Sequence, residues 1–118
     1  MIVELREYQV KPGMRDEWVE YMRSTIVPFQ QAHGMTVLGQ FVTTQSEDAF
    51  VWIRAFNDEA EMTRLSDAVY GSTEWMNEIA PMVSRYLVRG GARITLLDPI
   101  EVSGGRWTEV LGDALDRS

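Results

Sequence analysis

The chain of 118 residues contains no cysteine, one histidine (His33) and one lysine (Lys11). Without cysteine it can form no disulfide bond, thiol nucleophile or iron–sulfur cluster. With a single histidine, a metal site would have to be built from carboxylates. We therefore expect no metal site and no bound cofactor.

Long hydrophobic runs are also missing. A segment that spans a bilayer needs roughly twenty apolar residues, and the apolar stretches of this chain are far shorter. The residues Met1–Arg6 carry a charge at Glu4 and lack the apolar core of a signal peptide. The sequence therefore predicts a soluble, cytoplasmic protein with no membrane partner.

Basic residues are in the minority. Eighteen acidic and 11 basic residues give a net charge of −7 and a pI near 4.6. A surplus of negative charge disfavours contact with the phosphates of nucleic acids and of anionic lipids. We therefore expect no nucleic-acid partner either.

The residues that are present predict one folded domain, since 45% are hydrophobic and the length suits a single domain. Alternating residues predict strands over 2–10, 35–44, 49–56 and 92–97. Helical spacing predicts helices over 14–33, from the Asn57-Asp58 cap to Tyr70, and over 74–89, with a kink at Pro28. This order, β-α-β-β-α-β, is the ferredoxin-like α+β fold with a four-stranded antiparallel sheet.

We assign residues 1–98 to this domain and residues 99–118 to a C-terminal docking tail. The tail carries a short apolar stripe of Trp107, Val110, Leu111 and Leu115. Such a stripe predicts docking on the domain or on a partner subunit.

Two helices can cover only one face of the predicted sheet. The aliphatic face, with Val3, Leu5, Val51, Ile53 and Ala55, suits helix packing. We therefore expect the other face to be uncovered; it carries Glu4, Arg6, Tyr8, Phe50, Trp52, Arg54 and Phe56. A large apolar patch is seldom left in water on a monomer. A two-fold homodimer whose sheets face each other would cover it.

The ionisable groups of the aromatic face are the candidate site. Glu4 pairs with both arginines in one interpretation; in the other, the second arginine is left for a ligand anion. We take Arg6 and Tyr8 as candidate catalytic residues, and Glu4, Trp52 and Arg54 as candidate ligand-binding residues. His33 is a third catalytic candidate because it alone titrates near neutrality. Its place at a predicted helix end also suits a contact with terminal carbonyls.

The opening segment Ile2–Gly13, with the sequence IVELREYQVKPG, resembles the first strand and turn of the NIPSNAP family, within the dimeric α/β-barrel superfamily. Three further segments support this resemblance. They are His33-Gly34 followed by Leu38-Gly39-Gln40-Phe41, the strand end Ala55-Phe56-Asn57, and Trp75 after an acidic residue.

The resemblance implies a homodimer whose sheets close into a barrel, with a small-molecule pocket in each subunit. Its superfamily includes cofactor-free monooxygenases, haem-degrading enzymes, isomerases and binding proteins, so the fold alone selects no activity. Whether the chain is an enzyme stays open. One hypothesis is an enzyme, a cofactor-independent monooxygenase or isomerase, acting on a small, partly aromatic or enolisable acid. There Arg6 and Arg54 stabilise the oxyanion, and Tyr8 or His33 moves the proton. The alternative is a non-catalytic homodimer that binds small molecules or proteins.

Overall fold

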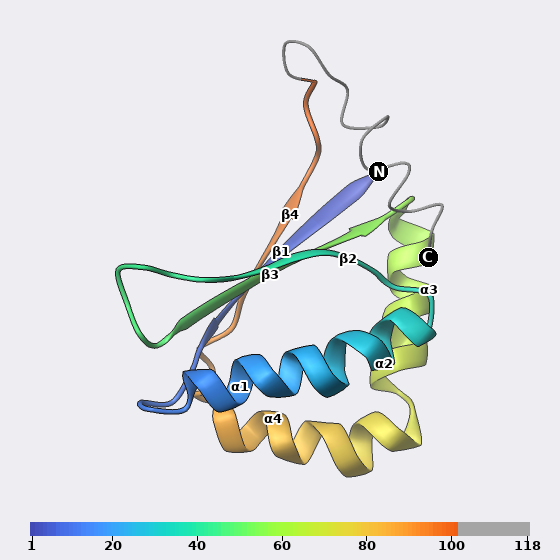
Figure 1. Ribbon diagram of the computed structural model, residues 1–118. Helices are drawn as coiled ribbons and strands as arrows, with labels where there is room; N and C mark the ends of the chain where they lie inside the picture. The colour runs from blue at the N-terminus through green and yellow to red at the C-terminus, as the bar shows by residue number, and fades with distance from the viewer. Residues whose placement is uncertain (102–118) are drawn as a thin grey trace.

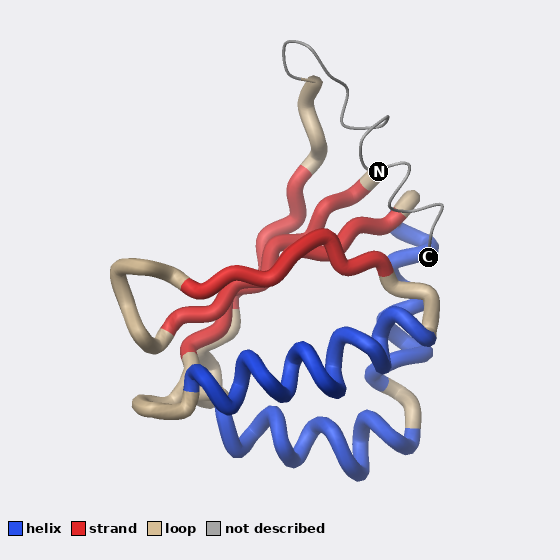
Figure 2. Tube along the Cα trace, in the orientation of Figure 1, coloured by secondary structure: helices blue, strands red, loops and turns tan. Residues whose placement is uncertain are grey.

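The computed structural model describes residues 1–101, which form one antiparallel sheet with helices on one side of it (Figures 1 and 2). The elements are β1 (Ile2–Gln9), α1 (Arg15–Tyr21), η1 (Met22–Ile26), α2 (Val27–Ala32), β2 (Thr36–Val42), β3 (Ala49–Phe56), α3 (Glu59–Tyr70), η2 (Trp75–Ile79), α4 (Ala80–Tyr86) and β4 (Arg93–Leu97). The strand order β2-β3-β1-β4 confirms the ferredoxin-like α+β fold.

Two of the predicted helices contain a π-helical turn, η1 and η2. Each widened turn is followed by a proline in the first turn of the next helix, Pro28 in α2 and Pro81 in α4. Proline has no amide hydrogen, and its ring crowds the carbonyl four residues earlier. A local π turn relieves that crowding without ending the helix. The irregularity predicted at Pro28 therefore lies just before the proline.

The predicted helix boundaries follow from side-chain caps. The Asp58 carboxylate accepts a hydrogen bond from the Glu61 amide (2.8 Å), and Glu61 accepts one from the Asn57 side chain (2.8 Å). This reciprocal pair begins α3. At the end of α2, His33 is the capping residue, and Gly34 has a φ of 97°, a left-handed conformation that favours glycine.

The face of the sheet that the helices cover is the opposite of the one that we predicted. Phe50, Trp52 and Phe56 are at most 1% exposed and lie in the core, where Phe50 and Trp52 pack with Trp18 of α1. Aromatic side chains bury the most apolar area per residue, so placing them under the helices gains more than placing aliphatic ones there. The charges on this face are satisfied within the chain, as described below.

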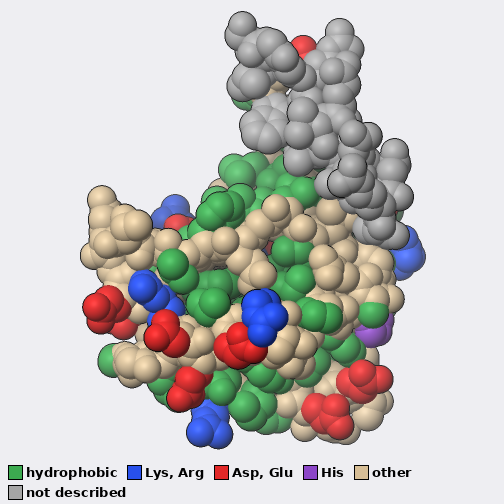
Figure 3. Space-filling model, viewed as in Figure 1, with side chains coloured by type: hydrophobic (Ala, Val, Ile, Leu, Met, Phe, Trp, Pro, Cys, Tyr) green, Lys and Arg blue, Asp and Glu red, His purple; other side chains and the backbone are tan. Residues whose placement is uncertain are grey.

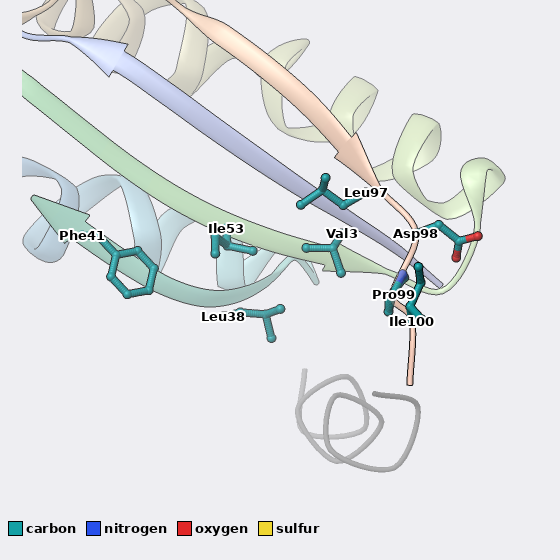
Figure 4. Close-up of a pocket in the computed structure, with 8 residues that line it drawn as sticks. All are labelled: Val3, Leu38, Phe41, Ile53, Leu97, Asp98, Pro99 and Ile100. Carbon is teal, nitrogen blue, oxygen red and sulfur yellow. The ribbon is translucent and has the colours of Figure 1, made fainter. Parts of the chain in front are cut away.

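The aliphatic face is therefore the uncovered one among the described residues. It contains a hollow of about 500 Å³, lined by Val3, Leu38, Phe41, Ile53, Leu97, Asp98, Pro99 and Ile100 (Figure 4). A bulge in β2 between Val37 and Gly39 adds Leu38 to this surface. Apolar side chains gather over the sheet in the space-filling view (Figure 3).

No helix within residues 1–101 is long and apolar enough to cross a membrane. The docking tail predicted for residues 99–118 lies outside the described residues from Val102 onward. Its docking stays a prediction.

Removing the residues after Ile100 is expected to lower the melting temperature or the dimer affinity. Calorimetry would measure the melting temperature, and dilution experiments would measure the dimer affinity. No change in either quantity would show that the tail does not dock.

We predict that Trp52→Glu lowers the free energy of unfolding by about 4 kcal/mol, because it removes a buried aromatic side chain and buries a charge. Urea denaturation followed by circular dichroism would measure this change. Gln40→Glu is the matched control, since Gln40 lies opposite Trp52 in the register and is exposed. The control should change the free energy by less than about 0.5 kcal/mol. Equal stabilities for the two variants would contradict the burial of Trp52.

Candidate functional site

A buried ion pair joins the two central strands beneath the helices. Glu4 of β1 and Arg54 of β3 are cross-strand neighbours, 5% and 0% exposed. Oε1 of Glu4 accepts hydrogen bonds from Nε (2.9 Å) and Nη2 (2.6 Å) of Arg54. The same oxygen accepts a third bond from Nε of Arg6 (2.9 Å). Glu4 therefore pairs with both arginines, as the first interpretation of the sequence expected.

The remaining nitrogen of Arg54 is bound by the helices. Its Nη1 donates to Oε1 of Gln30 in α2 (2.8 Å) and to the hydroxyl of Tyr70 in α3 (3.0 Å), and it contacts Sδ of Met35 (3.0 Å). The rings of Trp52 and Phe56 lie 5.0 and 5.5 Å from the guanidinium carbon, within the range of cation–π attraction. Since all three guanidinium nitrogens are bonded to the protein, we assign Arg54 a structural role rather than a ligand-binding one.

Arg6 differs from Arg54 because it reaches the surface. Its side chain is 17% exposed, and within residues 1–101 it donates hydrogen bonds from Nε to Glu4 and from Nη1 to the hydroxyl of Tyr8 (3.0 Å). This arrangement leaves Nη2 for a further acceptor. The ring of Tyr70 lies 5.6 Å from the guanidinium carbon and covers one face of it.

Protonation in this cluster is set by burial and by the arginine charge. Burial alone would lower the pKa of Arg6, but the neighbouring Tyr8, Tyr70 and Glu4 outweigh it and raise the pKa above its ordinary value. Burial also raises the pKa of the Tyr8 phenol, and Arg6 only partly offsets that effect. Arg6 is therefore charged and Tyr8 protonated at neutral pH. With two guanidiniums and one carboxylate, the cluster of Glu4, Arg6 and Arg54 carries one net positive charge.

Trp52 forms an apolar wall beside this cluster. Its ring centroid lies 6.4 Å from that of Tyr8. The indole N–H of Trp52 is buried and has no hydrogen-bond partner among residues 1–101. Because the Trp52 ring is buried, its direct contact with a ligand stays a prediction.

His33 lies at the end of a row of aromatic rings. Its Nδ1 is 2.9 Å from the carbonyl of Phe29, so Nδ1 carries the hydrogen and donates it. From His33 the row of ring contacts runs through Phe29 and Trp75 to Tyr70, which covers Arg6. The structure therefore brings Arg6 and Tyr8 together but not His33. The helix-end contact expected of this residue is present, and its catalytic role stays a prediction.

Sequence reasoning missed Gln30 and Tyr70 as members of the cluster. Gln30 did carry a signal, since it continues the four-residue spacing of the buried Trp18, Met22 and Ile26. A polar residue at a buried position of a helix needs a polar partner. Tyr70 carried no such signal, because only the end of α3 brings it to Arg54. No group of acidic residues and histidine among residues 1–101 is arranged to hold a metal ion.

The strand order and the helices on one face of the sheet define a ferredoxin-like α+β domain. The model of the NIPSNAP family matches residues 3–100, so the chain belongs to the NIPSNAP family. This match confirms the resemblance predicted from the sequence. A comparison with curated protein sequences found no match.

Solved structures with the same fold include two from this family. An uncharacterised NIPSNAP domain protein from Burkholderia xenovorans has a TM-score of 0.76 and 16% identity, over 89% of this chain and 100% of its own. A NIPSNAP family protein from Agrobacterium tumefaciens has a TM-score of 0.77 and 20% identity, over 89% of this chain and 98% of its own. A putative antibiotic biosynthesis monooxygenase from Nitrosomonas europaea has a TM-score of 0.64 and 11% identity, over 86% of this chain and 100% of its own. These similarities show a shared fold.

We predict that Arg54→Met lowers the free energy of unfolding by about 3 kcal/mol. The change breaks a buried ion pair and leaves Gln30 and Tyr70 without their shared donor. Chemical denaturation would measure it. Arg64→Met, on the exposed side of α3, is the control and should stay within about 0.5 kcal/mol of the parent. If Arg54→Met were as stable as this control, the structural role of Arg54 would be refuted.

Proposed function

We propose that the protein binds or transforms a small, partly aromatic or enolisable organic acid at Arg6. The observation that carries this proposal is the net positive charge of the buried cluster, combined with the guanidinium nitrogen Nη2 of Arg6 that is left for an acceptor. A partly buried guanidinium forms strong, charge-assisted hydrogen bonds with carboxylates and enolates.

Each residue of the cluster has a distinct part in this proposal. Arg6 binds the carboxylate or the developing oxyanion. Tyr8, protonated because burial raises its pKa, is the group that can donate a proton or a hydrogen bond. Glu4 is a positioning residue, because its carboxylate holds Nε of Arg6 and leaves the outer edge of the guanidinium free for the ligand.

In the enzymatic form of the proposal, this site lowers the energy of an enolate or a similar anion. That chemistry serves both a cofactor-independent monooxygenase and an isomerase. The fold shared with the putative antibiotic biosynthesis monooxygenase of Nitrosomonas europaea supports keeping the oxygenase among the candidates. In the non-catalytic form, the same site only binds the acid.

We predict that aromatic carboxylates such as benzoate and salicylate raise the melting temperature of the parent protein, and that Arg6→Met abolishes this shift. A thermal-shift titration would measure both. The control is Arg93→Met, since Arg93 is exposed and its contact with Glu7 is long (3.9 Å). The control should keep the full ligand shift. Absence of any shift in the parent, or an equal shift in Arg6→Met, would refute the proposed site.

The second candidate function, an interaction homodimer, is supported by the uncovered aliphatic face. Phe41, Leu97 and Ile100 are 52%, 42% and 79% exposed there, beside the half-buried Val3 and Ile53. An apolar surface of this kind is typical of a protein interface. We propose that two copies pair through this face, in place of the aromatic face that the sequence suggested. Such a dimer is compatible with acid binding at Arg6, which lies on the other side of the sheet.

We predict that the parent is a dimer and that Ile53→Glu converts it into a monomer of 13.5 kDa. The substitution places an unpaired charge at the centre of the proposed interface. Light scattering after size exclusion would measure the mass across a dilution series. Gln45→Glu, in the exposed β2–β3 turn, should leave the dimer intact. A folded monomeric parent would refute the dimer.

A further inference from the structure

The edge strand β4 brings two apolar side chains next to the ionic cluster. Ile94 lies opposite Arg6 in the register, and Leu96 lies opposite Glu4. Cross-strand neighbours project from the same face of a sheet, with β-carbons about 5 Å apart. Ile94 and Leu96 therefore emerge on the helix side, Ile94 next to Arg6 and Leu96 next to Glu4.

These two side chains are exposed although their face of the sheet is the covered one. Ile94 is 51% and Leu96 is 54% exposed, whereas Phe50 and Trp52 on the same face are 1% exposed. Within the part of the chain that the structure describes, the core beneath the helices includes the aromatic side chains of β3 but neither of these two residues. An apolar ledge, formed by Ile94 and Leu96, thus lies open beside a partly buried positive charge.

Three side chains among residues 1–101 contact the guanidinium of Arg6. Its Nε donates a hydrogen bond to Glu4, its Nη1 donates one to the Tyr8 hydroxyl, and the ring of Tyr70 covers one face of the guanidinium. These contacts leave Nη2, in the plane of the guanidinium, for an acceptor. The carboxylate of Glu4 lies in the same cluster and would repel a second negative charge on the ligand.

We infer that Arg6, Ile94 and Leu96 form a binding site for a small monocarboxylic acid, whose carboxylate binds Nη2 and whose apolar body lies on the ledge. This inference rests on the proposed function and names its ligand class. One net positive charge matches one carboxylate, while a dianion such as a phosphate ester would meet Glu4. A neutral or cationic compound would leave the charge of Arg6 unmatched.

The length of the ledge sets the size of the apolar body. Two residues of a strand span about 7 Å, which corresponds to a single six-membered ring or a chain of about six carbons. Burial of each methylene up to that length should strengthen binding roughly fourfold. Further methylenes would extend past Leu96 into solvent and add little.

A calorimetric titration with acetate, butyrate, hexanoate and decanoate tests this inference. For the parent we expect affinity to rise from acetate to hexanoate, by roughly fourfold per methylene, and then to level off. Ile94→Ser and Leu96→Ser should each lower the affinity for hexanoate about tenfold and leave acetate unchanged. Val42→Ser is the matched control, because Val42 is an exposed apolar side chain (44%) on β2, the opposite edge strand of the sheet, and it should keep the parent profile.

The outcomes separate this inference from the proposed function. If all four acids bind with equal affinity and Arg6→Met abolishes binding, the site at Arg6 stands and the ledge is wrong. If Val42→Ser removes the dependence on chain length while Ile94→Ser and Leu96→Ser keep it, the apolar body does not lie on the ledge and the inference is overturned. If no acid, aliphatic or aromatic, binds the parent, both fail.

Discussion

The single carboxylate of Glu4, buried between two guanidiniums, is the interaction on which the rest of this structure depends. Burying Arg54 completely is favourable only because that carboxylate and the polar groups of two helices satisfy its nitrogens. The same bonds tie β1 to β3 and the sheet to α2 and α3. The core and the candidate site therefore share the same buried residues, Glu4 and Arg54. The charge that Glu4 leaves uncompensated is the property that makes Arg6 a candidate binding group.

The order of the elements was predictable from the sequence because alternation and helical spacing are local properties. Which face of the sheet the helices cover was not, because alternation defines two faces and does not rank them. Sequence reasoning preferred aliphatic side chains under the helices and expected a partner subunit to cover the aromatic face with its charged groups. The structure satisfies those charges internally through Gln30 and Tyr70, residues far from Arg54 in the sequence. Because the charges are satisfied within the chain, the larger apolar area of the aromatic residues decided which face of the sheet is buried.

The candidate site was predicted in part for the same reason. Arg6, Tyr8 and Glu4 lie on one strand with a two-residue period, so their common face was evident from the sequence. Arg54 belonged to the neighbouring strand, and its pairing with Glu4 followed from the expected sheet. The ledge of β4 could not be inferred, since the register and the extent of the helix layer decide whether Ile94 and Leu96 are covered.

The π turn η1 (Met22–Ile26) has a consequence for the rotational phase of the helix that contains it. Trp18, Met22, Ile26 and Gln30 follow one another at intervals of four residues and are all buried. In a regular α-helix each such interval overshoots a full turn by about 40°, so three intervals would carry the last side chain about 120° away from the first. The wider turn absorbs part of this drift and keeps Gln30 directed at Arg54. The extra residue in the π turn thus sets the direction in which the Gln30 amide approaches the buried guanidinium of Arg54. Removing one residue from this turn would rotate the Gln30 amide away from Arg54.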